Sequence, residues 1–174
     1  MRRVAVLFVV ICLAVGVPTA GAATGQNFDA HLSGDQEIPA RDTDATGHAV
    51  FRLDSSGTKL DYRLIVANVE NVVASHIHVG ALGENGPVVA FLYGPVPAGG
   101  GRSDGVIATG TITAADLVGP LAGHPLADLV DQMRAGTAYV NVHTNDGIAP
   151  INTGPGDFPG GEIRGQIAAG GPRP

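Results

Sequence analysis

The feature that most constrains the fold is a two-residue alternation of apolar and polar side chains, repeated in short segments. Between residues 60 and 66, for example, every second residue is apolar, and Asp61 and Arg63 stand between them. Successive side chains of a strand point to opposite faces, so this pattern predicts strands with one buried face. Together with two continuous apolar runs, the predicted strands fall at residues 28–32, 49–54, 60–66, 75–79, 88–93, 106–112, 139–143 and 162–167.

Glycine and proline separate these segments and favour turns over long helices. The 174 residues include 26 Gly and 12 Pro, and this length suits one domain. We therefore expect an all-β protein, either an antiparallel β-sandwich or a flattened Greek-key barrel of about eight strands. Long loops are expected at 94–104 and 145–161. One short helix is expected where apolar residues recur at helical spacing: Leu126, Leu129, Val130 and Met133.

The first 22 residues have the pattern of a secretory signal peptide. Arg2 and Arg3 precede an apolar run of about 14 residues, too short for a membrane span. Small residues at 20–22 predict cleavage near Ala22. We thus expect a secreted or periplasmic protein with a signal peptide over 1–22 and one domain over 23–174, whose core spans 27–168. The only cysteine, Cys12, lies in the leader, so the mature domain would have no disulfide.

The charge balance limits the expected partners. Ten Lys and Arg against sixteen Asp and Glu give a formal net charge of −6, with no basic stripe along the mature chain. Nucleic acid and anionic membrane surfaces are therefore not expected as partners. We expect instead an extracellular protein or a small ligand.

Three histidines form the strongest candidate site. His76 and His78 are two residues apart in a predicted strand, so their side chains share the face opposite Ile77. His143 is expected on the outer face of another strand by the same parity argument. Three neutral imidazoles with an open position are a ligand set for zinc or copper. The alternative is that these histidines are solvated on an outer sheet face.

Four further residues near these strands have weaker signals. Arg164 is expected on an outer face and would have a catalytic role only if the protein is an enzyme. His31 is interpreted as a surface residue, and His124 as a capping or surface residue at the start of the helix. His48 is interpreted as a turn residue, with a fourth-ligand role as the alternative.

Several motifs in order make the chain similar to the CHRD domain, a module first named in chordin and also found singly in exported bacterial proteins. The resemblance covers about residues 27–168 and implies export and a β-rich domain. In chordin the family's context is extracellular binding of growth factors, which implies a binding module. The motifs are Phe28-x-Ala-x-Leu-Ser-Gly-x-Gln-Glu-x-Pro39, Ala45-Thr-Gly47, Leu60-x-Tyr62, Ala74-Ser-His-Ile-His-Val-Gly80, Tyr139-Val-Asn-Val-His-Thr144 and Pro159-Gly-Gly-Glu-Ile-Arg-Gly-Gln-Ile167.

A more distant resemblance is to copper-zinc superoxide dismutase, in the order of His-x-His, long loops, Val-x-Val-His and a glycine-rich loop leading to an arginine. It implies that His76, His78 and His143 are copper ligands and that Arg164 guides an anion. The zinc-site histidines and the disulfide of that family have no counterpart here. Only a copper-only variant therefore stays open.

Three functions follow from these observations. The leading one is a secreted CHRD-type binding module that holds one copper or zinc ion through the three histidines. The alternative is a copper-only, superoxide-dismutase-like oxidoreductase. The third is a binding module without a metal, in which the histidines orient loops by hydrogen bonding.

Overall fold

The computed structural model describes residues 26–170, and the expected signal peptide lies outside them. Within this part of the chain, nine strands, one α-helix and three short 3₁₀ helices form. The 3₁₀ helices span Gly34–Gln36, Ala114–Asp116 and Gly119–Leu121, and α1 spans Leu126–Arg134. The strands are β1 (Asn27–Ser33), β2 (Thr46–Leu53), β3 (Leu60–Glu70), β4 (Val72–Val79), β5 (Val88–Tyr93), β6 (Arg102–Ile112), β7 (Ala138–Thr144), β8 (Ile163–Gln166) and β9 (Ala168–Ala169).

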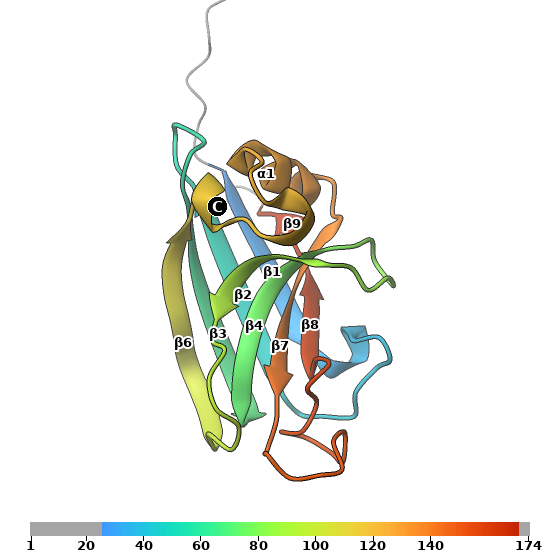
Figure 1. Cartoon of the computed structure of the whole chain (residues 1–174). Coiled ribbons are helices and arrows are strands. Elements are labelled where there is room, and N and C mark those ends of the chain that lie inside the picture. Colours follow the sequence, from blue (N-terminus) through green and yellow to red (C-terminus); the bar gives the residue numbers. More distant parts are fainter. Residues whose placement is uncertain (1–25, 171–174) are drawn as a thin grey trace, which may run out of the picture.

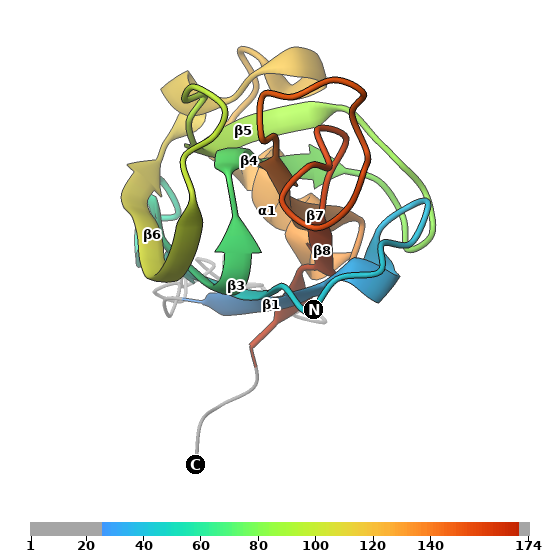
Figure 2. The same ribbon diagram turned by 90° about the horizontal axis from the view of Figure 1, so that it is seen from below.

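The strands form one antiparallel sheet that curls into a nearly closed barrel (Figure 1). Hydrogen bonds connect them in the order β5-β4-β7-β8-β1-β2-β3-β6, and β9 pairs with β1. Figure 2 shows β5 and β6, the two ends of this order, side by side. The Tyr62 hydroxyl of β3 also donates a hydrogen bond of 2.8 Å to the Leu92 carbonyl of β5. The prediction of an all-β fold with one short helix is confirmed.

The alternating residues of the strands fill the barrel interior. On β3, Leu60 and Leu64 are fully buried, whereas Asp61 and Arg63 between them are exposed. Helix α1 covers one end of the barrel (Figure 1), with Leu129 and Met133 fully buried. The other end carries the loops that follow β5 and β7 (Figure 2).

Three strands, β2, β4 and β6, begin three or more residues earlier than the sequence pattern predicts. β6 begins at Arg102, so the loop expected over 94–104 ends sooner; the pairing of Arg102 with Glu70 extends the strand beyond its apolar run. β2 begins at Thr46 and includes His48. The interpretation of His48 as a turn residue is therefore wrong, because His48 pairs with His31 of β1 and Ile65 of β3.

Candidate metal centre

Strands β4 and β7 place three histidines on one outer face of the barrel. His76 and His78 are alternate residues of β4, and Ile77 between them is fully buried in the core. His76 pairs with Asn141 of the neighbouring β7, and His143 lies two residues further along that strand. The structure thus brings together the three residues predicted as ligands, here called the three-histidine cluster.

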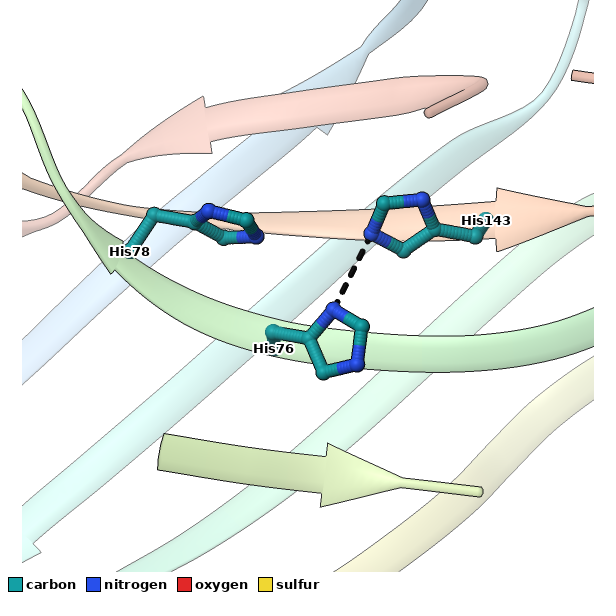
Figure 3. A group of neighbouring side chains, drawn as sticks. All are labelled: His76, His78 and His143. Carbon is teal, nitrogen blue, oxygen red and sulfur yellow. Dashed lines mark hydrogen bonds between the residues drawn. The ribbon is translucent and has the colours of Figure 1, made fainter. Parts of the chain in front are cut away.

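The ring nitrogens of this cluster converge (Figure 3). His76 Nδ1 lies 3.1 Å from His143 Nε2, and the His78 ring centroid lies 5.6 Å from that of His76 and 6.2 Å from that of His143. One nitrogen of each ring lies within 4.8 Å of the other two. Two ligand atoms at about 2.0–2.1 Å from a tetrahedral zinc ion are themselves about 3.4 Å apart. The rings are therefore close to the spacing that one ion requires.

Backbone carbonyls fix the tautomers of two of these rings. His78 Nδ1 lies 2.9 Å from the Gly86 carbonyl oxygen, and His143 Nδ1 lies 2.9 Å from that of Pro159. A carbonyl only accepts, so each Nδ1 carries the proton and each Nε2 keeps a lone pair. Metal-binding histidines typically donate their second ring nitrogen to a carbonyl or carboxylate in this way. Within residues 26–170, the buried His78 Nε2 has no hydrogen-bond partner.

The surroundings keep the three imidazoles neutral at neutral pH. Burial, and then the neighbouring His143 and His78, lower the pKa of His76 from 6.5 to about 4. Burial also lowers the pKa of His78 and that of His143. Neutral imidazoles offer lone pairs to a cation without first losing a proton, so the cluster suits zinc or copper.

Aromatic rings and loops form the walls of the cluster. The His78 ring stacks on Tyr139 at 4.8 Å, and the His76 ring meets the edge of Phe91 at the same distance. Phe91 is 48% exposed, so solvent reaches this side. Loop 80–87 contributes the Gly86 carbonyl and loop 145–161 contributes the Pro159 carbonyl, so two loops cover the other sides of the cluster.

Sequence reasoning missed two buried polar groups close to the cluster. Glu37 is 6% exposed, and burial raises its pKa to about 7. Asn141 is 4% exposed, and its side chain is near enough to Glu37 and His78 to affect the pKa of both. Both signals were in the sequence: Glu37 belongs to the Gln-Glu-x-Pro motif, and Asn141 has the same strand parity as His143.

Arg164 lies beneath the loop that follows β4. It is 1% exposed, and its guanidinium carbon lies 3.4 Å from the Tyr139 ring centroid. The guanidinium donates hydrogen bonds of 3.3 and 2.9 Å to the carbonyls of Ala81 and Glu84. In this conformation Arg164 holds loop 80–87 in place over the barrel face.

Glu162 anchors loop 145–161 beside the cluster through hydrogen bonds. It is fully buried, and its carboxylate accepts hydrogen bonds from Thr43 Oγ1, Thr144 Oγ1 and the Gly156 amide at 2.7, 2.7 and 2.8 Å. The Gly156 contact ties loop 145–161 to the residue that directly precedes β8. Because this loop carries Pro159, Glu162 also helps to position the carbonyl that orients His143.

The other predicted histidines do not join the cluster. His31 and His48 lie together on β1 and β2, so the alternative of His48 as a fourth ligand to the three-histidine cluster finds no support in the geometry. His124 precedes α1, and its Nδ1 lies 2.7 Å from Asp128 Oδ2. It is therefore a surface residue beside the first turn of the helix, as predicted.

Fold and site together define a class: a single antiparallel β-barrel with a three-histidine cluster on its outer face, enclosed by loops. The sequence profile of the CHRD domain matches residues 28–167. The chain belongs to the CHRD domain family, and the resemblance read from the sequence motifs is confirmed. The three histidines, Glu37 and Arg164 all lie within the matched region.

Two other findings complete the comparison. A search of curated proteins finds no significant match to this chain. None of the helices between residues 26 and 170 has the length and apolar character needed to cross a membrane.

Proposed function

We propose that this CHRD domain is an exported binding module whose three-histidine cluster holds one copper or zinc ion. The observation that carries the proposal is the buried Nε2 of His78, which has no partner among residues 26–170 although its ring is fixed by Gly86. A buried acceptor without a partner costs about 1–3 kcal/mol. A bound ion would remove this cost by accepting the lone pair.

The pre-set tautomers also support a metal. His78 and His143 have their Nδ1 protons bound to carbonyls, so an ion does not have to reorient either ring. His143 Nε2 accepts from His76 Nδ1, so the His76 proton must move to its Nε2 before Nδ1 can bind the ion. Three imidazoles leave one position of a tetrahedral ion open, and this position is where a ligand or a donor from a partner would bind. Both zinc and copper accept this donor set.

The redox alternative additionally requires a movement of loop 80–87. In a copper-only oxidoreductase, Arg164 would attract an anion to the open position. Arg164 is 1% exposed and its guanidinium is bound to carbonyls of loop 80–87. An anion would reach it only after this loop moves. The binding function needs no such movement, and we therefore favour it over catalysis.

Export is part of the proposal and rests on the sequence of residues 1–22. An apolar run preceded by two arginines and followed by small residues is the pattern of a cleaved leader. Outside the cytoplasm, the domain would meet an extracellular protein or a small ligand. The charge balance argues against nucleic acid as the partner.

Elemental analysis tests the metal site. The protein, purified without a histidine tag, is incubated with copper or zinc and desalted. We expect about one tightly held equivalent, lost in His76→Ala/His78→Ala and retained in the matched control His124→Ala. His124 is a suitable control because it is an exposed histidine outside the cluster. Metal content that is the same in all three proteins would refute the site. A superoxide dismutation rate of the copper-loaded protein above that of free copper would instead favour the redox alternative.

A further inference from the structure

A second group of metal-ligating side chains lies on the outer face of β1 and β2. His31 of β1 and His48 of β2 are direct cross-strand partners, and Asp29 lies two residues before His31 on the same face. We call Asp29, His31 and His48 the β1–β2 cluster. Directly opposed side chains of an antiparallel pair have Cβ atoms about 4.5–5.5 Å apart, so the strand pairing itself holds the two rings together.

The three donor atoms of this cluster lie within 4.8 Å of one another and form no hydrogen bond among themselves. The imidazole rings are stacked at 4.3 Å with an interplanar angle of 4°. His31 Nε2 and His48 Nε2 each lie 3.6 Å from the same oxygen, Asp29 Oδ2. This distance is too long for a hydrogen bond. It is close to the separation of about 3.4 Å between two ligands of one tetrahedral zinc ion.

One ligand atom of the β1–β2 cluster is also without a hydrogen-bond partner among residues 26–170. His48 Nε2 is buried and, within the described part of the chain, has no hydrogen-bond partner. The cluster borders an open groove of about 940 Å³, which is also lined by Val50, Arg52 and Arg63. His31 is largely exposed, with 78% of its side chain accessible. A small cation therefore has access to the cluster from solvent.

We propose that the β1–β2 cluster is a second binding site for a divalent transition-metal ion, separate from the three-histidine cluster. The two Nε2 atoms and Asp29 Oδ2 become its ligands when one imidazole turns out of the stack, because the in-plane lone pairs of parallel rings do not point to a common position. Water from the groove completes the coordination. Two imidazoles and one carboxylate suit zinc, nickel or copper(II), whereas calcium and magnesium prefer oxygen ligands alone. Solvent reaches this ion directly, so we expect it to exchange faster than the ion under the loops.

Zinc titration by calorimetry tests this site on the purified protein without a histidine tag. We expect two equivalents for the parent and the loss of one equivalent in His31→Gln/His48→Gln. Asp29→Asn should also weaken this equivalent. The matched control is His124→Gln, which removes a histidine that also lies beside a carboxylate, at 2.7 Å, and we expect it to keep both equivalents. An unchanged zinc stoichiometry in His31→Gln/His48→Gln would overturn the proposal.

Histidine ¹⁵N NMR separates this proposal from the proposed function. On adding zinc, we expect the Nε2 signals of His31 and His48 to shift, whether or not the three-histidine cluster binds. If only the signals of His76, His78 and His143 move, the second site is refuted while the first stands. If only those of His31 and His48 move, the first site is refuted while the second stands.

Discussion

The three-histidine cluster and the β1–β2 cluster use the same strand geometry, but their surroundings differ. In both, histidines on neighbouring antiparallel strands project from the outer face of the barrel. At the first cluster, the Gly86 and Pro159 carbonyls fix two of the rings, and two loops cover them. At the second, the rings are stacked on each other and open to a groove. Strand pairing brings the metal-ligating side chains together, whereas hydrogen bonds from the rings to loop carbonyls determine how firmly each ring is oriented.

This difference leads us to expect unequal metal affinities. Carbonyl partners that orient ligating histidines commonly affect metal affinity by about 10–100-fold. The three-histidine cluster has two such partners, and no carbonyl contact to the His31 or His48 ring is found among residues 26–170. We therefore expect desalting to remove the ion from the β1–β2 cluster first.

The largest expected effect is the loss of thermal stability when the tighter ion is removed. An ion present at 1,000 times its Kd stabilises the folded state by about 4 kcal/mol. For a domain of this size, that corresponds to a Tm change of about 10 °C. We expect a chelator to lower the Tm of the parent and of His31→Gln/His48→Gln by similar amounts, as measured by calorimetry. A chelator effect that persists in His76→Ala/His78→Ala would show that the stabilising ion lies elsewhere.

A smaller effect is expected from Glu162→Gln, which tests the part played by the loops. The amide nitrogen of Gln cannot accept a hydrogen bond, so at least one of the donors from Thr43, Thr144 and Gly156 loses its acceptor. We expect the free energy of unfolding to fall by about 1–3 kcal/mol and metal affinity to fall at the three-histidine cluster only. Denaturant titration and zinc calorimetry measure the two effects.

The control for this variant is a destabilised turn that contributes no residue to either cluster. Asp54 Oδ1 accepts hydrogen bonds from the amides of Thr58 and Lys59 in the turn between β2 and β3. In Asp54→Asn the amide nitrogen cannot accept the hydrogen bond that Ser56 Oγ donates to Oδ2. This variant should therefore lower stability and leave zinc binding unchanged. If Asp54→Asn weakens zinc binding as much as Glu162→Gln does, the loop has no specific part in the site.

The pH dependence of the metal-free protein gives a third test. The pKa of His76 is about 4 in the folded protein against 6.5 when unfolded. Between these values the unfolded state binds more protons, so the stability contributed by neutral His76 is lost as pH falls from about 6.5 to about 4. Relative to His76→Asn, we expect the parent to lose stability across this window. Denaturant titrations at several pH values measure the difference.

The comparison with His76→Asn is needed because the ionisation of Glu37 changes stability with pH in the opposite direction. Its pKa is raised from 4.5 to about 7 on folding, so its contribution to stability is lost as pH rises through this range. Glu37 is present in both proteins, and its effect largely cancels in the difference. A difference that does not vary between pH 6.5 and 4 would contradict the burial of a neutral His76.

The sequence pattern was sufficient to predict the strand faces on which the three histidines lie. Parity along one strand places His76 and His78 on the same side, and the buried Ile77 between them sets which side that is. The adjacency of β4 and β7 could not be read from parity, because it depends on a pairing across more than 50 intervening residues. Only the resemblance to copper-zinc superoxide dismutase, which implies that the three histidines are copper ligands, indicated that these strands are neighbours.

The β1–β2 cluster was missed for a related reason. The segment before residue 49 has few apolar residues, so the start of β2 was placed too late and His48 was assigned to a turn. The register that opposes His48 to His31 depends on hydrogen bonds along the whole of β1 and β2. Buried polar residues such as Glu37 were missed as well, because their burial comes from loops, which have no sequence periodicity.

The smallest expected effect is that of Asp29→Asn on the stability of the metal-free protein. Asp29 Oδ2 lies 3.6 Å from both imidazoles, and about a third of its side chain is exposed. Exposed pairs of this kind contribute about 0–1 kcal/mol, so we expect the free energy of unfolding to change by less than about 0.5 kcal/mol. In zinc the difference between parent and variant should grow, because only the parent keeps the carboxylate ligand. Thermal unfolding with and without zinc, in the His76→Ala/His78→Ala background, measures this difference. An equal response of both proteins to zinc would mean that Asp29 is a surface carboxylate and that the two clusters differ in kind as well as in affinity.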